Sequence, residues 1–192
     1  MNIFFYGGTF DPPHLGHEMI IKQLLPSCDK FIVFPSKKSP LKNSKPIANG
    51  IQRIDMLALL FDDSKIEIDD YEIKSVNKSY TYLTIEYLKK KYEKSSFTMV
   101  VGKDQLKTLQ KWKLFDAFVD DINIICFNRN AQEELCVERF NDYKNIKFVD
   151  DFEYNISSTE IRKSLYHLNY KDSISMLDSR VLKYIKKNNL YA

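Results

Sequence analysis

Short apolar runs alternate along the whole chain with segments whose apolar residues recur every three or four positions. Short runs are typical of buried strands and the longer spacing is typical of helices, so the alternation predicts βαβ units around a parallel sheet. We expect an α/β fold of five or six parallel strands with helices on both faces of the sheet. The expected strands span 2–6, 30–34, 65–68, 97–101, 121–127 and 147–149. The expected helices span 16–25, 51–61, 80–92, 133–140, 158–166 and 180–188, with shorter helical pieces over 104–118.

Length, composition and charge narrow the class of protein. The 192 residues predict a single domain over 1–192, with a small C-terminal helical part from about 156 to 192. Hydrophobic residues make up 44% of the chain, enough for a sizeable core, and a net charge of only +3 gives no reason to expect a nucleic-acid partner. The three cysteines form no CxxC pair, and no apolar run reaches the roughly 20 residues that cross a bilayer. Without a basic, signal-like start, the sequence predicts a cytoplasmic protein with no membrane partner.

The segment after the first strand carries the strongest chemical signal, because ligands of parallel sheets bind at the carboxyl ends of strands. Gly7 and Gly8 predict a sharp backbone turn that can approach a ligand closely. His14 and His17 follow at a spacing that lets both rings face one ligand, and each ring offers an N–H donor to a phosphate oxygen. The alternatives are a loop with two incidental histidines, or a zinc site. We expect no protein-bound metal, since no further ligands with zinc spacing are visible.

A second anion-binding signal is the segment Ile156-Ser157-Ser158-Thr159-Glu160-Ile161-Arg162. Ser157 and Glu160 have the spacing of a capping box, which predicts a helix that begins directly after Ser157. The hydroxyl groups of Ser158 and Thr159 then lie at the positive end of the helix dipole, and Arg162 adds a permanent charge within two turns. An ordinary, well-capped helix is the alternative interpretation.

The two segments resemble the GGTFDPxHxGH and ISSTxIR motifs of the HxGH nucleotidyltransferase superfamily. The resemblance implies a Rossmann-like, doubly wound sheet. It also implies that ATP phosphates rest on the two histidines and the nearby backbone, and that Arg162 holds the leaving pyrophosphate. The residues that it assigns to ATP are Gly7, Gly8, Thr9, Phe10, Gly16, Gly102, Asp104, Ile156, Ser157 and Ser158. The groups that it assigns to catalysis are His14, His17, Lys42 and Arg162.

Three segments between these motifs resemble the nicotinate mononucleotide adenylyltransferase family. The matching residues are Pro35, Pro40 and Lys42 in a P-x-x-x-P-P-H-K pattern, Ser79, Tyr80, Thr81 and Thr84 in an SYTxDT pattern, and Gly102, Asp104 and Trp112 in a GxDxxxxLxxW pattern. Three residues depart from the family: Ser39, Leu41 and Leu83 stand where it has proline, histidine and aspartate. The resemblance assigns to nicotinate mononucleotide Lys42, Tyr80, Thr81, Thr84 and Trp112. Trp112 is then expected to stack on the pyridine ring, although a core position is the commoner fate of a tryptophan.

The activity that this resemblance implies is transfer of AMP from ATP to nicotinate mononucleotide, with release of pyrophosphate, in NAD biosynthesis. Mg²⁺ is expected to arrive with ATP, since the sequence has no dedicated carboxylate cluster. A homodimer is what relatives suggest. Nicotinamide mononucleotide and phosphopantetheine remain open as acceptors, and a non-catalytic nucleotide-binding regulatory module is the alternative of another class.

Overall fold

A computed structural model describes residues 1–38, 40, 44–76, 78–102, 105, 108–127, 140, 142–149, 156–167 and 175–191. Lys42, Asp104 and most of the helix expected over 133–140 lie outside the described residues. Predictions that depend on them are therefore not tested by the fold.

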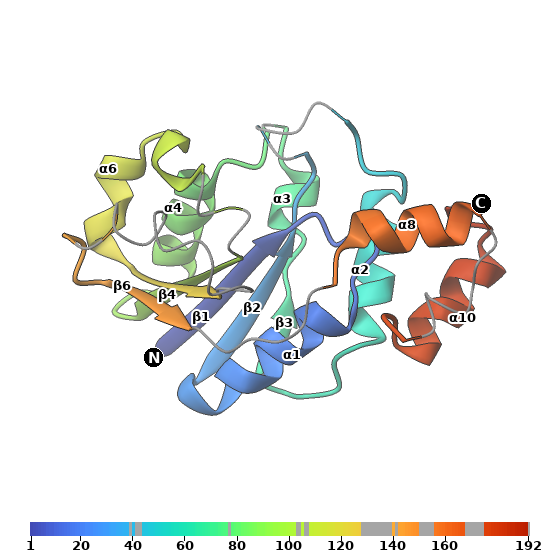
Figure 1. The fold of residues 1–192 in the computed structure, drawn as a ribbon. Coiled ribbons are helices and arrows are strands. Elements are labelled where there is room, and N and C mark those ends of the chain that lie inside the picture. Colours follow the sequence, from blue (N-terminus) through green and yellow to red (C-terminus); the bar gives the residue numbers. More distant parts are fainter. Residues whose placement is uncertain are drawn as a thin grey trace.

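Six parallel strands form one sheet in the order β3-β2-β1-β4-β5-β6, as Figure 1 shows. They are β1 (Asn2–Gly8), β2 (Lys30–Pro35), β3 (Ile66–Ile68), β4 (Ser96–Gly102), β5 (Asn123–Phe127) and β6 (Ile146–Val149). Every expected strand is present, and only the ends differ. The strand order reverses between β1 and β4, which places the ligand crevice of such a sheet at their carboxyl ends.

The helices that the structure describes are α1 (Leu15–Leu24), α2 (Gly50–Ala58), α3 (Tyr71–Lys74), α4 (Thr81–Lys91), α6 (Phe115–Phe118), α8 (Ser158–Tyr166) and α10 (Ser179–Lys187). Short 3₁₀ turns lie at Leu25–Ser27, Leu109–Lys111 and Val119–Asp121. The short helix α3 was not expected from the sequence. It follows Asp70 and spans a single turn, too short to produce a helical period of apolar residues.

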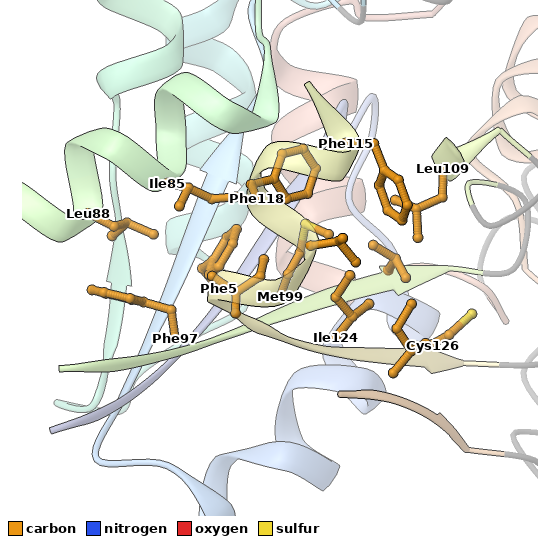
Figure 2. Packing of buried hydrophobic residues seen from close by; sticks show 14 of the residues in the cluster. Phe5, Ile85, Leu88, Phe97, Met99, Leu109, Phe115, Phe118, Ile124 and Cys126 are labelled. Carbon is orange, nitrogen blue, oxygen red and sulfur yellow. The ribbon is translucent and has the colours of Figure 1, made fainter. Parts of the chain in front are cut away.

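Alternate residues of the strands face opposite layers of helices, as a strand period of two requires. On one face, Phe5 and Phe97 pack with Ile85 and Leu88 of α4, and Figure 2 shows these side chains pointing toward one another. On the other face, strand residues such as Phe31 pack against α1. The prediction of helices on both faces is therefore confirmed.

A third cluster of buried apolar residues joins α2, α8 and α10, which lie together at one end of the molecule in Figure 1. Its members include Met56 of α2, Ile161 of α8 and Val181 of α10, all fully buried. Asp178 caps α10 by accepting from the backbone N–H of Arg180 at 2.8 Å. The C-terminal helices are thus packed against the element that follows the second strand.

Candidate active site

Two cavities adjoin at the carboxyl ends of β1 and β4. We call the first the phosphate pocket; its volume is about 280 Å³. It brings together most residues that the sequence assigned to ATP or catalysis: Gly7, Gly8, Thr9, Phe10, His14, His17, Gly102, Ile156, Ser157, Ser158 and Arg162. We call the second the aromatic pocket, with a volume of about 420 Å³; it gathers Tyr80, Thr81, Thr84 and Trp112. The two pockets share the lining residues Gly7, Gly8, Thr9 and Gln105.

The two histidines of the phosphate pocket stack on each other, with ring centroids 3.6 Å apart and planes inclined by 26°. The backbone N–H of His14 donates to Nδ1 of His17 at 3.2 Å. A nitrogen that accepts a hydrogen bond carries no proton, so neutral His17 has its proton on Nε2. His17 therefore combines a fixed ring with an N–H donor at the phosphate pocket.

The glycine pair does not form the expected turn, because β1 continues through Gly8 and no described glycine has a positive φ. The positive φ of 50° falls on Phe10 instead. Gly8 is needed for packing, since a Cβ there would lie 2.8 Å from Cζ of Phe10. At Gly7 a Cβ would meet no atom within 4 Å, so that residue opens directly onto both pockets.

Gly16 is not among the described residues that line the phosphate pocket, and its assignment as an ATP contact stays a prediction. It is buried, and a Cβ there would lie 3.1 Å from Nδ1 of His14. Gly16 therefore leaves room for the His14 ring, which is itself only 2% exposed.

The predicted start of α8 is confirmed, and Ser157 caps it by accepting from the backbone N–H of Glu160 at 3.2 Å. The hydroxyl of Ser158 donates to the carbonyl of Pro12 at 2.9 Å. Ser158 therefore ties α8 to the loop between β1 and α1, and its expected contact with a phosphate stays a prediction. The first backbone N–H groups of α8 remain as donors that have no partner within the helix.

Arg162 contributes its charge to the pocket while bonding the same loop. Its Nη1 donates to the carbonyl of Asp11 at 2.6 Å and its Nη2 to the hydroxyl of Thr159 at 3.2 Å. Because guanidinium has five N–H donors, these bonds fix the group and leave donors for an anion.

Two cations beside the phosphate pocket, Lys45 and Arg53, have no role in the predictions made from the sequence. Lys45 is exposed and lines the phosphate pocket, but it lies in a polar loop with several other lysines and no motif singles it out. Arg53 is 2% exposed and donates to the carbonyls of Thr9 and Ser36 at 2.7 Å, and to that of Ala48 at 3.2 Å. Burial lowers its pKa, an effect that the charge of nearby Asp11 opposes. Arg53 thus joins the loop after β1 to the loop between β2 and α2, and both loops border the pockets.

The aromatic pocket has Trp112 in its wall, and this side chain also packs against the core cluster of α4 and α6. Trp112 therefore takes part in the core and also lines the pocket, and its stacking on a pyridine ring stays a prediction. Lys113 lies over the rings of Tyr80 and Tyr82, with Nζ 4.9 and 5.4 Å from their centroids. This lysine lines the pocket and brings positive charge to the start of α4.

A buried acid, Glu72 of α3, is the unexpected polar group of the aromatic pocket. The hydroxyl of Thr84 donates to its Oε1 at 2.8 Å. Burial raises the pKa of the Glu72 carboxyl, and hydrogen bonds from Ser79 and Thr84 act against that rise. The Thr84 hydroxyl is therefore engaged with Glu72, and the expected contact of Thr84 with the substrate stays a prediction.

Three further properties concern the part of the chain that the structure describes. No group of three or more His, Cys, Asp or Glu residues there could hold a metal ion. Cys28 and Cys126 are buried, and neither forms a disulfide bond with another described residue. None of the described helices has the length and apolar character needed to cross a membrane.

Known proteins share both the sequence pattern and the fold. A family model described as cytidylyltransferase-like matches residues 5–164. A probable nicotinate-nucleotide adenylyltransferase of Hydrogenobaculum sp. is 37% identical over 100% of this chain and 99% of its own length. The corresponding protein of Leptospira interrogans is 33% identical over 97% of this chain and 95% of its own length.

Among solved structures, nicotinic acid mononucleotide adenylyltransferase of Plasmodium falciparum complexed with NaAD matches with a TM-score of 0.83. The match covers 99% of this chain and 97% of that one at 23% identity, so it shows a shared fold. The family itself is shown by the sequence identities of 33% and 37%, which extend over nearly the full length of both chains. This chain belongs to the cytidylyltransferase-like family and, within it, to the nicotinate-nucleotide adenylyltransferases.

Proposed function

We propose that the chain transfers AMP from ATP to nicotinate mononucleotide, giving nicotinate adenine dinucleotide and pyrophosphate. The observation that carries the proposal is the junction of two unlike cavities at Gly7, Gly8 and Thr9. One cavity is lined by donors for phosphates and the other by aromatic rings, so a triphosphate and a flat-ringed mononucleotide can meet end to end. Family membership agrees with this arrangement.

The chemistry requires no covalent intermediate. The 5′-phosphate oxygen of the acceptor forms a bond to the α-phosphorus of ATP as the bond from that phosphorus to the bridging oxygen breaks, and pyrophosphate leaves with the electron pair. The acceptor phosphate is already ionised near neutral pH, so the protein mainly positions groups and neutralises charge. His14, His17 and the first turn of α8 are the donors that face this charge, and Mg²⁺ enters with ATP as part of the substrate.

Preference for the acid over the amide is the finer part of the proposal. The start of α4, with the backbone at Thr81, points the positive end of a helix dipole at the aromatic pocket. Lys111 and Lys113 add positive charge to its lining. A ring carboxylate gains from both features, whereas an uncharged carboxamide gains less.

The test is pyrophosphate release from ATP and Mg²⁺ with one acceptor at a time: nicotinate mononucleotide, nicotinamide mononucleotide or phosphopantetheine. We expect release chiefly with nicotinate mononucleotide. Equal release with the amide removes the proposed acid preference and leaves the adenylyl transfer standing. Preference for phosphopantetheine, or ATP binding without release for any acceptor, overturns the proposed function.

A further inference from the structure

Asp11 fixes the loop between β1 and α1 through three hydrogen bonds to its buried carboxylate. Asp11 is 3% exposed. Its Oδ2 accepts from the backbone N–H of Ile47 at 2.8 Å, and its Oδ1 accepts from that of Ala48 at 3.0 Å. The third donor is the hydroxyl of Tyr191, 2.7 Å from Oδ1. A residue near the end of the printed sequence is thus bonded directly to the loop of the phosphate pocket.

The backbone at Tyr191, the residue that makes this bond, has an unfavourable conformation. Its φ is 65°, and that of Asn189 just after α10 is 49°. Left-handed backbone costs a bulky side chain about 1 kcal/mol or more, and such strain persists only where the surroundings fix it. The Tyr191 ring is 5% exposed and packs with α2, α8 and α10. Packing and the bond to Asp11 together hold the residue in place.

We infer that Tyr191 is a positioning residue for the phosphate pocket, acting through Asp11 on the backbone that presents His14 and His17. The inference rests on the proposed function, because it concerns the rate of adenylyl transfer. His14 follows Asp11 closely in the same loop, and its backbone N–H donates to the His17 ring. A shift of this loop therefore moves both imidazoles.

The chain offers a matched control in Tyr184, which lies on α10 and also donates to an aspartate. Its hydroxyl is 2.8 Å from Oδ2 of Asp55 on α2, in an exposed position. Neither Tyr184 nor Asp55 lines the phosphate pocket or the aromatic pocket. The two tyrosines thus make the same kind of bond from the same part of the chain, and only one bond reaches the catalytic loop.

The experiment compares Tyr191→Phe with Tyr184→Phe, each of which removes one oxygen and keeps the ring. We expect kcat to fall about tenfold in Tyr191→Phe, since small misplacement of catalytic groups costs large factors in rate. KM for ATP should stay within about twofold of wild type, because the lost positioning matters most in the transition state. Tyr184→Phe should keep wild-type kcat. Equal kcat in the two variants overturns the inference.

A second readout does not depend on turnover. Amide hydrogen exchange in a peptide covering residues 9–17 should speed up in Tyr191→Phe and stay unchanged in Tyr184→Phe. Slower turnover without faster exchange, or faster exchange without slower turnover, contradicts the inference. If the wild-type chain releases no pyrophosphate with nicotinate mononucleotide, the proposed function fails, and the exchange comparison still decides whether Tyr191 fixes the loop.

Discussion

The phosphate pocket and the aromatic pocket share a border but are built differently. In the phosphate pocket, groups such as Ser158 and Arg162 are already bonded to the loop between β1 and α1, so the donors are fixed before a ligand arrives. The aromatic pocket offers ring surface from Trp112 and encloses a buried acid, Glu72. Fixed donors aimed at developing charge raise the rate, whereas contacts to an unreacting ring raise affinity. Substitutions in the two pockets should therefore separate kcat from KM.

The largest effect is expected in the phosphate pocket, from His17→Ala. It removes an N–H donor from the pocket where charge develops during transfer, and we expect kcat to fall on the order of a hundredfold by analogy with the loss of an oxyanion donor. Steady-state pyrophosphate release measures the change. The control is His167→Ala, which removes the exposed histidine after α8. Comparable kcat values for the two variants would contradict the role of the phosphate pocket in the rate.

The next effect belongs to the aromatic pocket, where Trp112→Ala should raise KM for nicotinate mononucleotide about tenfold. Stacking of a base on an aromatic side chain contributes about 1–3 kcal/mol, and a tenfold change corresponds to about 1.4 kcal/mol. KM for ATP should change little, which the same kinetic experiment reports.

Trp112 also supports the core, so its removal needs a control for packing. Tyr143 packs against the same core cluster but does not line the aromatic pocket. Tyr143→Ala should lower the melting temperature without raising KM for the acceptor. If both variants raise KM alike, loss of packing rather than loss of stacking explains the effect.

The third effect is a pH dependence that arises from Glu72. Burial raises the pKa of Glu72 above its ordinary value of 4.5. In the pH window between 4.5 and that raised pKa, the folded chain keeps a proton that the unfolded chain releases. Stability therefore falls as the pH rises through the window, by up to about 1.4 kcal/mol per pH unit. Glu72→Gln removes this titration. We measure the free energy of unfolding of both proteins by urea denaturation between pH 4 and pH 8. The value for Glu72→Gln should increase relative to that of wild type as the pH rises.

The same substitution at Glu67 should change stability with pH in the opposite direction: the variant should lose stability relative to wild type as the pH rises. Burial would raise the pKa of Glu67, but hydrogen bonds from Lys30, Lys91 and Tyr92 outweigh it and lower that pKa to about 2. These bonds stabilise the fold fully above pH 4.5, and their contribution is lost as the pH falls toward 2. Glu67→Gln should therefore destabilise by about 2 kcal/mol at neutral pH and approach wild type in acid. A parallel pH response of both variants would contradict the contrast.

The two pockets also differ in how far the sequence predicted them. The phosphate pocket follows from short contiguous segments, and the predicted start of α8 after Ser157 is confirmed because a cap is a local signal. The strands were predictable for the same reason, since the period of apolar residues is local. Motif matching also assigned Gly16 to ATP, which stays a prediction, and the packing adds that this glycine makes room for His14.

Long-range pairings explain what the sequence did not predict. Arg53 joins the loops at Thr9 and Ser36, and Glu72 accepts from Thr84, but each partner lies far away along the chain or on another element. A single arginine or glutamate in an amphipathic segment looks like a solvated surface residue. Only the packing of α2 and α3 against the sheet brings these charges inside.

The smallest expected effect is a difference in stability between substitutions of one serine in each pocket. Ser36 is 7% exposed, and its hydroxyl has no hydrogen-bond partner among the described residues, whereas the Ser158 hydroxyl donates to Pro12. Removing an unpaired buried hydroxyl is neutral or favourable, while removing a paired one costs about 1 kcal/mol. Urea denaturation should therefore show Ser36→Ala as stable as wild type or up to about 1 kcal/mol more stable, and Ser158→Ala about 1 kcal/mol less stable. Destabilisation of Ser36→Ala in the absence of ligand would show that the hydroxyl is bonded in solution. A loss that appears only with nicotinate mononucleotide present would instead show that Ser36 meets the acceptor.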